Sequence, residues 1–176
     1  MKDLTTECQL VIGYIIRKTN EYNLSKNENE QVPLTIKRIQ KILYLTQVES
    51  IKHSGSHMFE DDFYALPAGP IIPGVYDLYL DYTTKGTFPV KLPKGILNKE
   101  KQQLIDCILE STYDINNHDL INQVRNMDDL WINAYNPNSK QIITKNMMYN
   151  CYYNQTKVKT KKLDTIRTSN KNGVNI

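Results

Sequence analysis

Apolar residues return at helical spacing along most of the chain, and this pattern predicts a mainly α-helical protein of five to six helices. The first apolar face consists of Cys8, Val11, Ile12, Ile15, Ile16 and Thr19. It is preceded by Thr6-Glu7-Cys8-Gln9, which is typical of a capping box in which the Thr6 hydroxyl and the Gln9 side chain bond free backbone amides. The pattern therefore predicts a first helix from Thr6 to about Glu21.

Polar caps combine with the same spacing to predict the later helices. Thr35 is expected to cap a second helix, whose apolar face continues to Ile51. Gly55 is expected to end this helix in the left-handed conformation. Further helices are predicted from Pro73 to Tyr82, after Asn98, from Asp119 to Asn126 and after Thr144.

Two short segments have β character. Phe59, Phe63 and Ala65 fall on one side of an extended chain, because strand side chains alternate between faces. Gly69-Pro70 is expected to break regular structure as a turn. The predicted fold is therefore mainly α, a compact helical domain with a small β element around residues 59–66 and 87–92, the second part being an edge strand.

Charge is distributed unevenly along the 176 residues. Residues 155–176 hold six basic side chains and one acidic one, a net charge of +5, whereas residues 1–154 hold 16 basic and 18 acidic side chains, a net charge of −2. The 155–176 segment also has few apolar residues. We therefore expect one domain over residues 1–154 and a basic, flexible tail over residues 155–176.

Several observations bear on the compartment. No apolar run is long enough to span a bilayer, and the first residues lack the apolar stretch of a signal peptide, so a cytoplasmic protein without membrane contact is expected. Cys8, Cys107 and Cys151 are far apart, odd in number, and lie within apolar helical patterns. We therefore expect reduced thiols buried in the core.

The chain resembles a known family in the segment Phe-Glu-Asp-Asp-Phe-Tyr-Ala-Leu-Pro-Ala-Gly-Pro-Ile-Ile-Pro-Gly-Val-Tyr, residues 59–76. This is similar to the signature of the Panacea domain, the SocA-like antitoxin family that is often phage-associated. Further runs that resemble the family are Ile39-Gln40-Lys41-Ile42-Leu43-Tyr44 with Gln47, Trp131 with Ala134, and Tyr152-Tyr153. The resemblance spans residues 8–154. It departs from the family pattern at Leu66, Asn126 and Leu130, where an aromatic residue, His and Pro are usual.

The resemblance implies an antitoxin that neutralises a co-encoded toxin by direct contact, and for some members an adaptor that delivers the toxin to an AAA+ protease. The expected partner-binding residues are Tyr64, Leu66, Gly69, Pro70, Ile71, Tyr76 and Trp131. Rigid aromatic and aliphatic side chains are good interface anchors. Tyr64, Leu66 and Ile71 are expected to be exposed, whereas Phe63 and Tyr76 are expected in the core. The plainer interpretation is that Gly69-Pro70 only redirects the chain.

Nucleic-acid binding is a second class of function. In the tail, the residues that would contact phosphates are Lys157, Lys159, Lys161, Lys162 and Arg167. Lys37, Arg38 and Lys41 lie on the second predicted helix, where Lys37 and Lys41 form a weak basic patch. The interpretation that we favour is that the tail maintains solubility or contacts an acidic partner, since no helix-turn-helix pattern accompanies it. A phage-encoded inhibitor of a host defence protein would use the same physics of binding.

Catalysis is a third class, and no catalytic motif is present. His53, His57 and His118 are dispersed in the sequence, and the apolar setting of each cysteine favours an inert thiol. The carboxylates at residues 60–62 and 128–129 match no metal-binding spacing. We therefore expect a binding protein with no catalytic residue, metal or cofactor. A metal-dependent or cysteine hydrolase is the alternative.

Overall fold

The computed structural model describes residues 4–85, 95–127, 129–139 and 141–154. Within these ranges the chain is mainly helical, as predicted, with one small antiparallel sheet. The α-helices are α1 (Thr6–Asn23), α2 (Ile36–Ser54), α3 (Gly74–Lys85), α4 (Lys99–Thr112), α5 (Asn117–Arg125), α6 (Asp129–Ala134) and α7 (Lys145–Tyr149). The strands are β1 (Phe63–Leu66), β2 (Gly69–Ile71) and β3 (Gln141–Ile143), and the short helical turns are η1 (Glu28–Glu30) and η2 (Asn150–Asn154).

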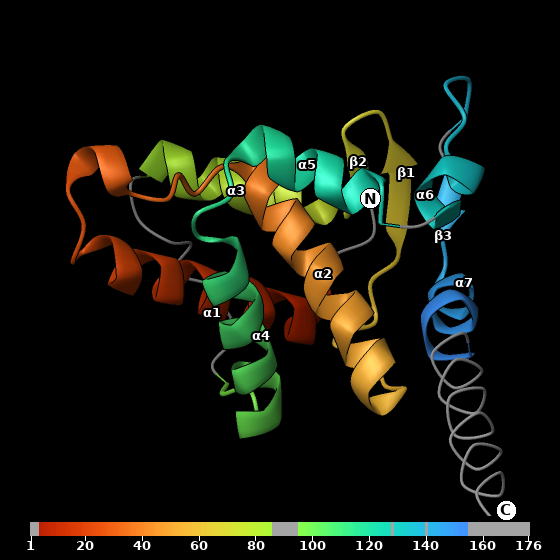
Figure 1. Ribbon diagram of the computed structural model, residues 1–176, viewed down its shortest axis with the longest axis horizontal. Coiled ribbons are helices and arrows are strands. Elements are labelled where there is room, and N and C mark those ends of the chain that lie inside the picture. The colour runs from red at the N-terminus through yellow and green to blue at the C-terminus, as the bar shows by residue number, and fades with distance from the viewer. Residues whose placement is uncertain (1–3, 86–94, 128, 140, 155–176) are drawn as a thin grey trace, which may run out of the picture.

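Helix α2 runs through the middle of the domain, with α1 and α4 on one side and the sheet on the other (Figure 1). Every residue from Arg38 to Val48 is buried, so the helix is enclosed around its whole circumference. Its polar side chains therefore need hydrogen-bond partners inside the protein, because a buried polar group without one destabilises the fold. These side chains position the site described below.

Local sequence signals placed most helix ends correctly. Thr35, Asn98 and Thr144 are N-caps, and the side chain of each accepts a hydrogen bond from the backbone amide three residues later. Gly55 ends α2 with φ of 71°, the left-handed conformation that a residue without Cβ adopts readily. Helix α5 begins at Asn117, two residues before the predicted start, because Asn116 caps it.

The cap of α1 differs from the prediction by one residue. Thr5, not Thr6, is the N-cap, and its hydroxyl accepts a hydrogen bond from the amide of Cys8 at 3.2 Å. The carboxylate of Asp61 accounts for this choice, since it bonds the Thr5 hydroxyl and also accepts from the Thr5 amide at 3.1 Å. The Gln9 side chain instead donates to the carbonyl of Leu4 at 2.9 Å. A residue 56 positions away therefore takes the place of the predicted capping-box partner.

The sheet has the strand order β2-β1-β3, and both pairs are antiparallel. The prediction that Gly69-Pro70 breaks regular structure was wrong. These two residues begin β2, and the turn lies at residues 67–68. Pro70 is tolerated because β2 is an edge strand. Strand β3 was not predicted. The predicted strand at 87–92 lies within residues 86–94, which are outside the described residues.

The core lies between α2, α1, α4 and the inner face of the sheet. Phe59, Phe63 and Ala65 are fully buried, as their predicted alternation requires. The rings of Tyr44 and Phe63 meet edge to face at 5.1 Å, and the hydroxyls of Tyr44 and Tyr152 lie 3.0 Å apart in the interior. None of the described helices has both the length and the apolar composition required to cross a bilayer.

Candidate partner-binding site at the β1–β2 hairpin

Two buried polar side chains of α2 fix β2 to the helix. The Gln40 side chain pairs with both backbone groups of Ile72: its Oε1 accepts from the amide at 2.8 Å and its Nε2 donates to the carbonyl at 2.9 Å. The next residue, Lys41, donates from Nζ to the carbonyl of Pro70 at 2.9 Å. Gln40 and Lys41 are 3% and 1% exposed, so water does not compete for these bonds. The hairpin is therefore held in one position on α2.

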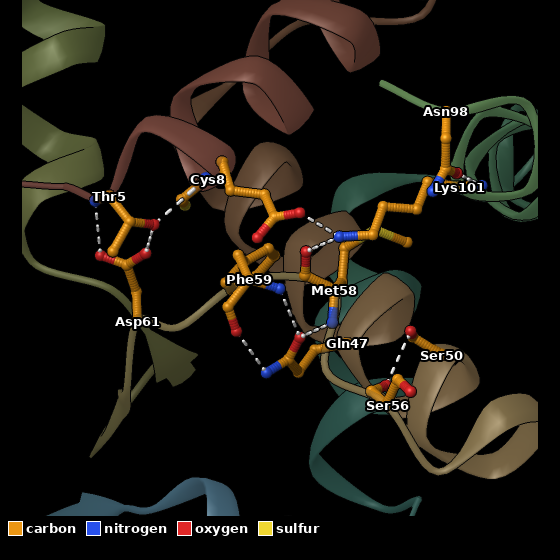
Figure 2. A network of polar contacts seen from close by, with 11 residues as sticks. Thr5, Cys8, Gln47, Ser50, Ser56, Met58, Phe59, Asp61, Asn98 and Lys101 are labelled. Atoms are coloured by element: carbon orange, nitrogen blue, oxygen red, sulfur yellow. Dashed lines mark hydrogen bonds and ion pairs between the residues drawn. The ribbon is translucent and has the colours of Figure 1, made fainter. Parts of the chain in front are cut away.

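The segment that leads into the hairpin is fixed in the same way, as Figure 2 shows. Gln47 accepts from the amides of Met58 and Phe59 at 2.8 and 3.3 Å, and donates to the Phe59 carbonyl at 3.1 Å. The Lys101 ammonium of α4 donates to the Met58 carbonyl at 2.8 Å and also pairs with Glu7 of α1. Helices α2 and α4 thus bond two consecutive residues before the hairpin begins, and α1 holds the lysine of α4 through Glu7.

Gly69 packs closely against two basic side chains, Lys41 and Arg125. Its φ is 93°, a backbone angle that residues with a Cβ rarely adopt. A Cβ at this position would lie 2.9 Å from Lys41 Nζ and 3.3 Å from Arg125 Cγ. Burial, and to a smaller extent the nearby positive charge of Arg125, lower the pKa of Lys41 to about 7. The backbone of the hairpin therefore lies directly over a buried amine.

Trp131 holds the other strand of the hairpin. Its Nε1 donates to the carbonyl of Leu66 at 3.0 Å. One face of its ring is close to Arg125, whose guanidinium carbon lies 4.5 Å from the ring centroid, and the ring also stacks on Tyr135 at 5.0 Å. Cation–π contact and stacking both fix the orientation of the indole. Helices α5 and α6 therefore fix strand β1 of the hairpin, while α2 fixes strand β2.

The outer face of the sheet presents an apolar row. In β1, Tyr64 lies directly opposite Ile71 of β2 and Ile142 of β3. Residues opposite one another in antiparallel strands share a face, so these three side chains form a continuous row across the sheet. Ile142 is 41% exposed, and Tyr64 and Ile71 are partly exposed. This row, Ile71–Tyr64–Ile142, is called the outer row below.

The predicted partner-binding residues divide into three groups in space. Tyr64 and Ile71 belong to the outer row, and Leu66 is partly exposed beside them in β1. Gly69, Pro70 and Trp131 are buried and support the hairpin from within. Tyr76 was expected in the core, but it lies on α3 and is 54% exposed. Three further residues of this site, Ile142, Lys41 and Arg125, were not predicted as parts of it, because each reaches the hairpin from a distant segment.

The family model described as antitoxin SocA-like, Panacea domain, matches residues 39–132. This match covers more than half of the 176 residues. The chain belongs to the SocA-like antitoxin family with a Panacea domain. Neither a search of the curated proteins nor a search of the solved structures gave a match.

The two runs of sequence that resembled the Panacea domain contact one another in this structure. Gln40, Lys41 and Gln47 come from the run on α2, and they bond the backbone of Phe59, Pro70 and Ile72, which lie in the run over residues 59–76. Trp131, at the end of the matched region, bonds the same hairpin. The polar residues of the motif in this Panacea domain therefore have a structural role, which is to fix the hairpin.

The predicted basic patch of this Panacea domain is not present on α2. Lys41 is buried under the hairpin and Arg38 is 2% exposed. Arg38 donates from its two terminal nitrogens to the carbonyls of Ile115 at 2.8 Å and Thr112, so it closes the C-terminus of α4, where a cation is favourable. Burial lowers the pKa of Arg38. Only Lys37 of the three is exposed, so these residues do not form a surface for phosphates.

The cysteines do not all lie in the core. Cys8 is fully buried, and burial together with the nearby Asp61 raises the pKa of its thiol. Cys107 of α4 is exposed, contrary to expectation, and Cys151 is only partly buried. No disulfide joins any two of these three cysteines.

A cavity of about 630 Å³ lies between the end of α2, residues 54–58 and α4. Its lining includes Cys107, His53 and His57 together with Glu49 and Glu100, which the sequence had shown only as dispersed residues. No three His, Cys, Asp or Glu residues in the described part of the chain are placed to hold a metal ion. The cavity lies beside the Gln47 contacts and apart from the outer row.

Proposed function

We propose that this protein neutralises a co-encoded toxin by direct contact, and that the outer row is the centre of the contact surface. Membership of the SocA-like antitoxin family supports a toxin partner. The observation that carries the proposal is the outer row itself, partly exposed apolar side chains on a sheet whose inner face is fixed in the core. A surface that is already ordered binds with little loss of conformational entropy.

The size and chemistry of the row suit this role. A tyrosine flanked by two isoleucines offers a rigid, mainly apolar surface with one polar group. Tyrosine is one of the residue types that contribute most to the binding energy of protein interfaces. Leu66 extends the row along β1, and Tyr76 on α3 adds a second exposed ring. In this proposal the protein carries out no reaction, and neutralisation follows from covering the toxin.

Growth rescue tests the proposal. The gene next to the one that encodes this protein is expressed alone and together with it, and growth and toxin abundance are both followed. We expect arrest by the neighbouring gene alone and rescue by the wild type, with the toxin still present in the cells. Rescue with loss of the toxin would instead assign the protease-adaptor role. No rescue of a toxic neighbour would contradict the proposal.

Variants of the outer row locate the surface. Tyr64→Asp places a charge at the centre of the row and should abolish rescue, whereas Leu24→Asp should not. Leu24 is 88% exposed just beyond α1, and the end of α1 lies on the opposite side of the molecule from the sheet (Figure 1). Equal rescue by both variants would exclude the outer row.

The charge of residues 155–176 favours nucleic-acid binding as a second candidate function. A net charge of +5 on this segment, next to −2 on the remainder, suits electrostatic association with phosphates. Deletion of residues 155–176 should remove both DNA binding and its dependence on salt. A Lys37→Gln variant is the matched control, since it removes one exposed charge from α2. Binding that survives the deletion would contradict this role.

A further inference from the structure

Two cations lie beneath the hairpin without a neighbouring carboxylate among the described residues. Lys41 Nζ and Arg125 Cγ both come within 3.3 Å of the point where a Cβ of Gly69 would stand. Neither side chain forms an ion pair with any carboxylate in the described ranges. Asp61, the one buried carboxylate of the described residues, bonds Thr5 at the start of α1. The positive charge at this point is therefore not balanced within the described structure.

Such an arrangement is unusual in a protein interior. Lysine is almost never fully buried unless it is paired, because removing an ammonium from water costs free energy that only a partner charge or several hydrogen bonds offset. Within the described ranges the Lys41 ammonium, which has three N–H donors, donates a hydrogen bond to one acceptor, the Pro70 carbonyl. Burial and Arg125 together lower its pKa to about 7. A carboxylate placed here would relieve this cost.

Arg125 provides the part of the site that a ligand can reach. Its side chain is only partly buried, whereas Lys41 is 1% exposed. The contact with the Trp131 ring, whose centroid lies 4.5 Å from the guanidinium carbon, restricts where the guanidinium can move. A planar guanidinium held in this way is suited to bidentate hydrogen bonding with a carboxylate.

We propose that Arg125, reinforced by the buried Lys41 beneath Gly69, binds an acidic side chain of the partner protein. The inference rests on the proposed function, since it assigns a chemistry to one contact of the same hairpin. Arg125 makes the direct contact, and Lys41 acts on the carboxylate through its field from beneath the backbone. The outer row contributes apolar contacts, and Arg125 adds one charge-assisted contact at its edge. The complementary surface of the partner is therefore apolar and carries an acidic residue.

Partner binding is coupled to protonation of Lys41. The titratable group that acts on Lys41 from the elements packed against it is Arg125 of α5, and β2 contributes only the uncharged Pro70 carbonyl. A bound carboxylate favours the protonated amine, so the pKa of Lys41 rises and the complex holds more protons than the free protein. Affinity should therefore fall as pH rises above about 7.

The first experiment uses the full chain alone. The Lys41 amine is titrated by NMR without ligand, with acetate, and with inorganic phosphate. We expect acetate to raise the pKa of Lys41 in the wild type and in Arg17→Gln, and not in Arg125→Gln. No change with acetate would overturn the proposal. A rise with phosphate alone would also overturn it, and would assign the site to a phosphate or nucleic-acid ligand.

Asp128 requires a separate control, because it follows Arg125 by three residues and lies outside the described residues. In Asp128→Asn the pKa of free Lys41 should equal that of the wild type. If this substitution lowers the pKa, the site is already filled by a carboxylate of this chain, and the proposal is wrong.

The second experiment uses the toxin identified by growth rescue. Calorimetry in buffers of different ionisation enthalpy gives both the affinity and the protons taken up on binding. Arg125→Gln should weaken binding by roughly 30-fold or more, in the range measured when one member of a buried charge pair is removed. Lys41→Met should abolish proton uptake at pH above about 7, and Arg17→Gln should change neither quantity. Wild-type affinity in Arg125→Gln, or binding without proton uptake, would overturn the inference while leaving the proposed function intact. A wild type that binds no toxin would contradict the proposed function, and the acetate titration would still decide the anion site.

Discussion

The side chain of Gln40 hydrogen-bonds both backbone groups of Ile72. The side-chain amide of a buried helix therefore makes the two bonds that a neighbouring strand would make to the residue after β2. Gln47, seven residues further along α2, pairs in the same manner with Phe59 and also with Met58. These two glutamines enclose the hairpin segment at its start and at its end. The segment is therefore ordered before any partner binds.

Removal of either glutamine should destabilise the fold. Gln47→Leu leaves the amides of Met58 and Phe59 buried without an acceptor, and each such group costs about 1–3 kcal/mol. We expect a loss of about 2–4 kcal/mol in the free energy of unfolding, measured in urea. Gln103→Leu on the exposed side of α4 is the control and should change it little. Equal stability of the two variants would show that the Gln47 contacts contribute nothing.

Because of Lys41, the free energy of unfolding should increase as the pH rises above about 7. Its pKa is about 7 in the folded chain and lies near 10.4 in an unfolded one, so between these values the unfolded chain binds the extra proton. Raising the pH therefore stabilises the fold, by up to about 1.4 kcal/mol per pH unit, and below about pH 7 the dependence disappears. Thermal unfolding of the wild type and Lys41→Met across this range is the measurement. If the stability of the wild type and that of Lys41→Met changed with pH in the same way, the lowered pKa of Lys41 would be contradicted.

Gly69→Ala should be more harmful than an ordinary glycine substitution. The residue has φ of 93°, and the new Cβ would lie 2.9 Å from Lys41 Nζ and 3.3 Å from Arg125 Cγ. Strain at such a φ is worth about 1–3 kcal/mol. The double variant with Lys41→Met separates the two causes, because it removes the amine and leaves the backbone strain. We expect partial recovery of thermal stability in the double variant. No loss in Gly69→Ala itself would contradict this view of the hairpin.

Features fixed by neighbouring residues could be predicted from the sequence, and features fixed by distant ones could not. The caps at Thr35, Asn98 and Thr144 depend on amides three residues away, so local pattern was sufficient. The choice of Thr5 over Thr6 depends on Asp61, and adjacent threonines give no local reason for it. Strand β3 has only three residues, too few for an alternation to be recognised.

The candidate site shows the same division. Tyr64 and Ile71 were identified because the family signature and their apolar character lie in one segment. Lys41 was interpreted as a surface charge, because its helical position predicts a face but not whether another element covers that face. Arg125 reaches Gly69 from α5, 56 residues away in the chain, and no local pattern indicates that contact. The family resemblance located the hairpin, and the structure supplied its charges.

The thiols offer a test that does not depend on the partner. Cys107 is exposed on α4, whereas Cys8 is fully buried and its pKa is raised by burial and by Asp61. Because the thiolate is the reactive form, an aromatic disulfide reagent should modify Cys107 rapidly and Cys8 only on unfolding. Peptide mapping after brief labelling identifies the modified residue. Rapid labelling of Cys8 in the folded protein would contradict the packing of α1.

Photo-crosslinking tests the central claim most directly. A benzophenone amino acid is placed at Tyr64 in the outer row, or at Leu24 beyond α1 as the control, and the full chain is mixed with the toxin found by growth rescue. We expect a crosslinked complex from position 64 and none from position 24. Crosslinks from position 24 alone, with a toxin that the wild type neutralises, would show that another face of the protein binds it.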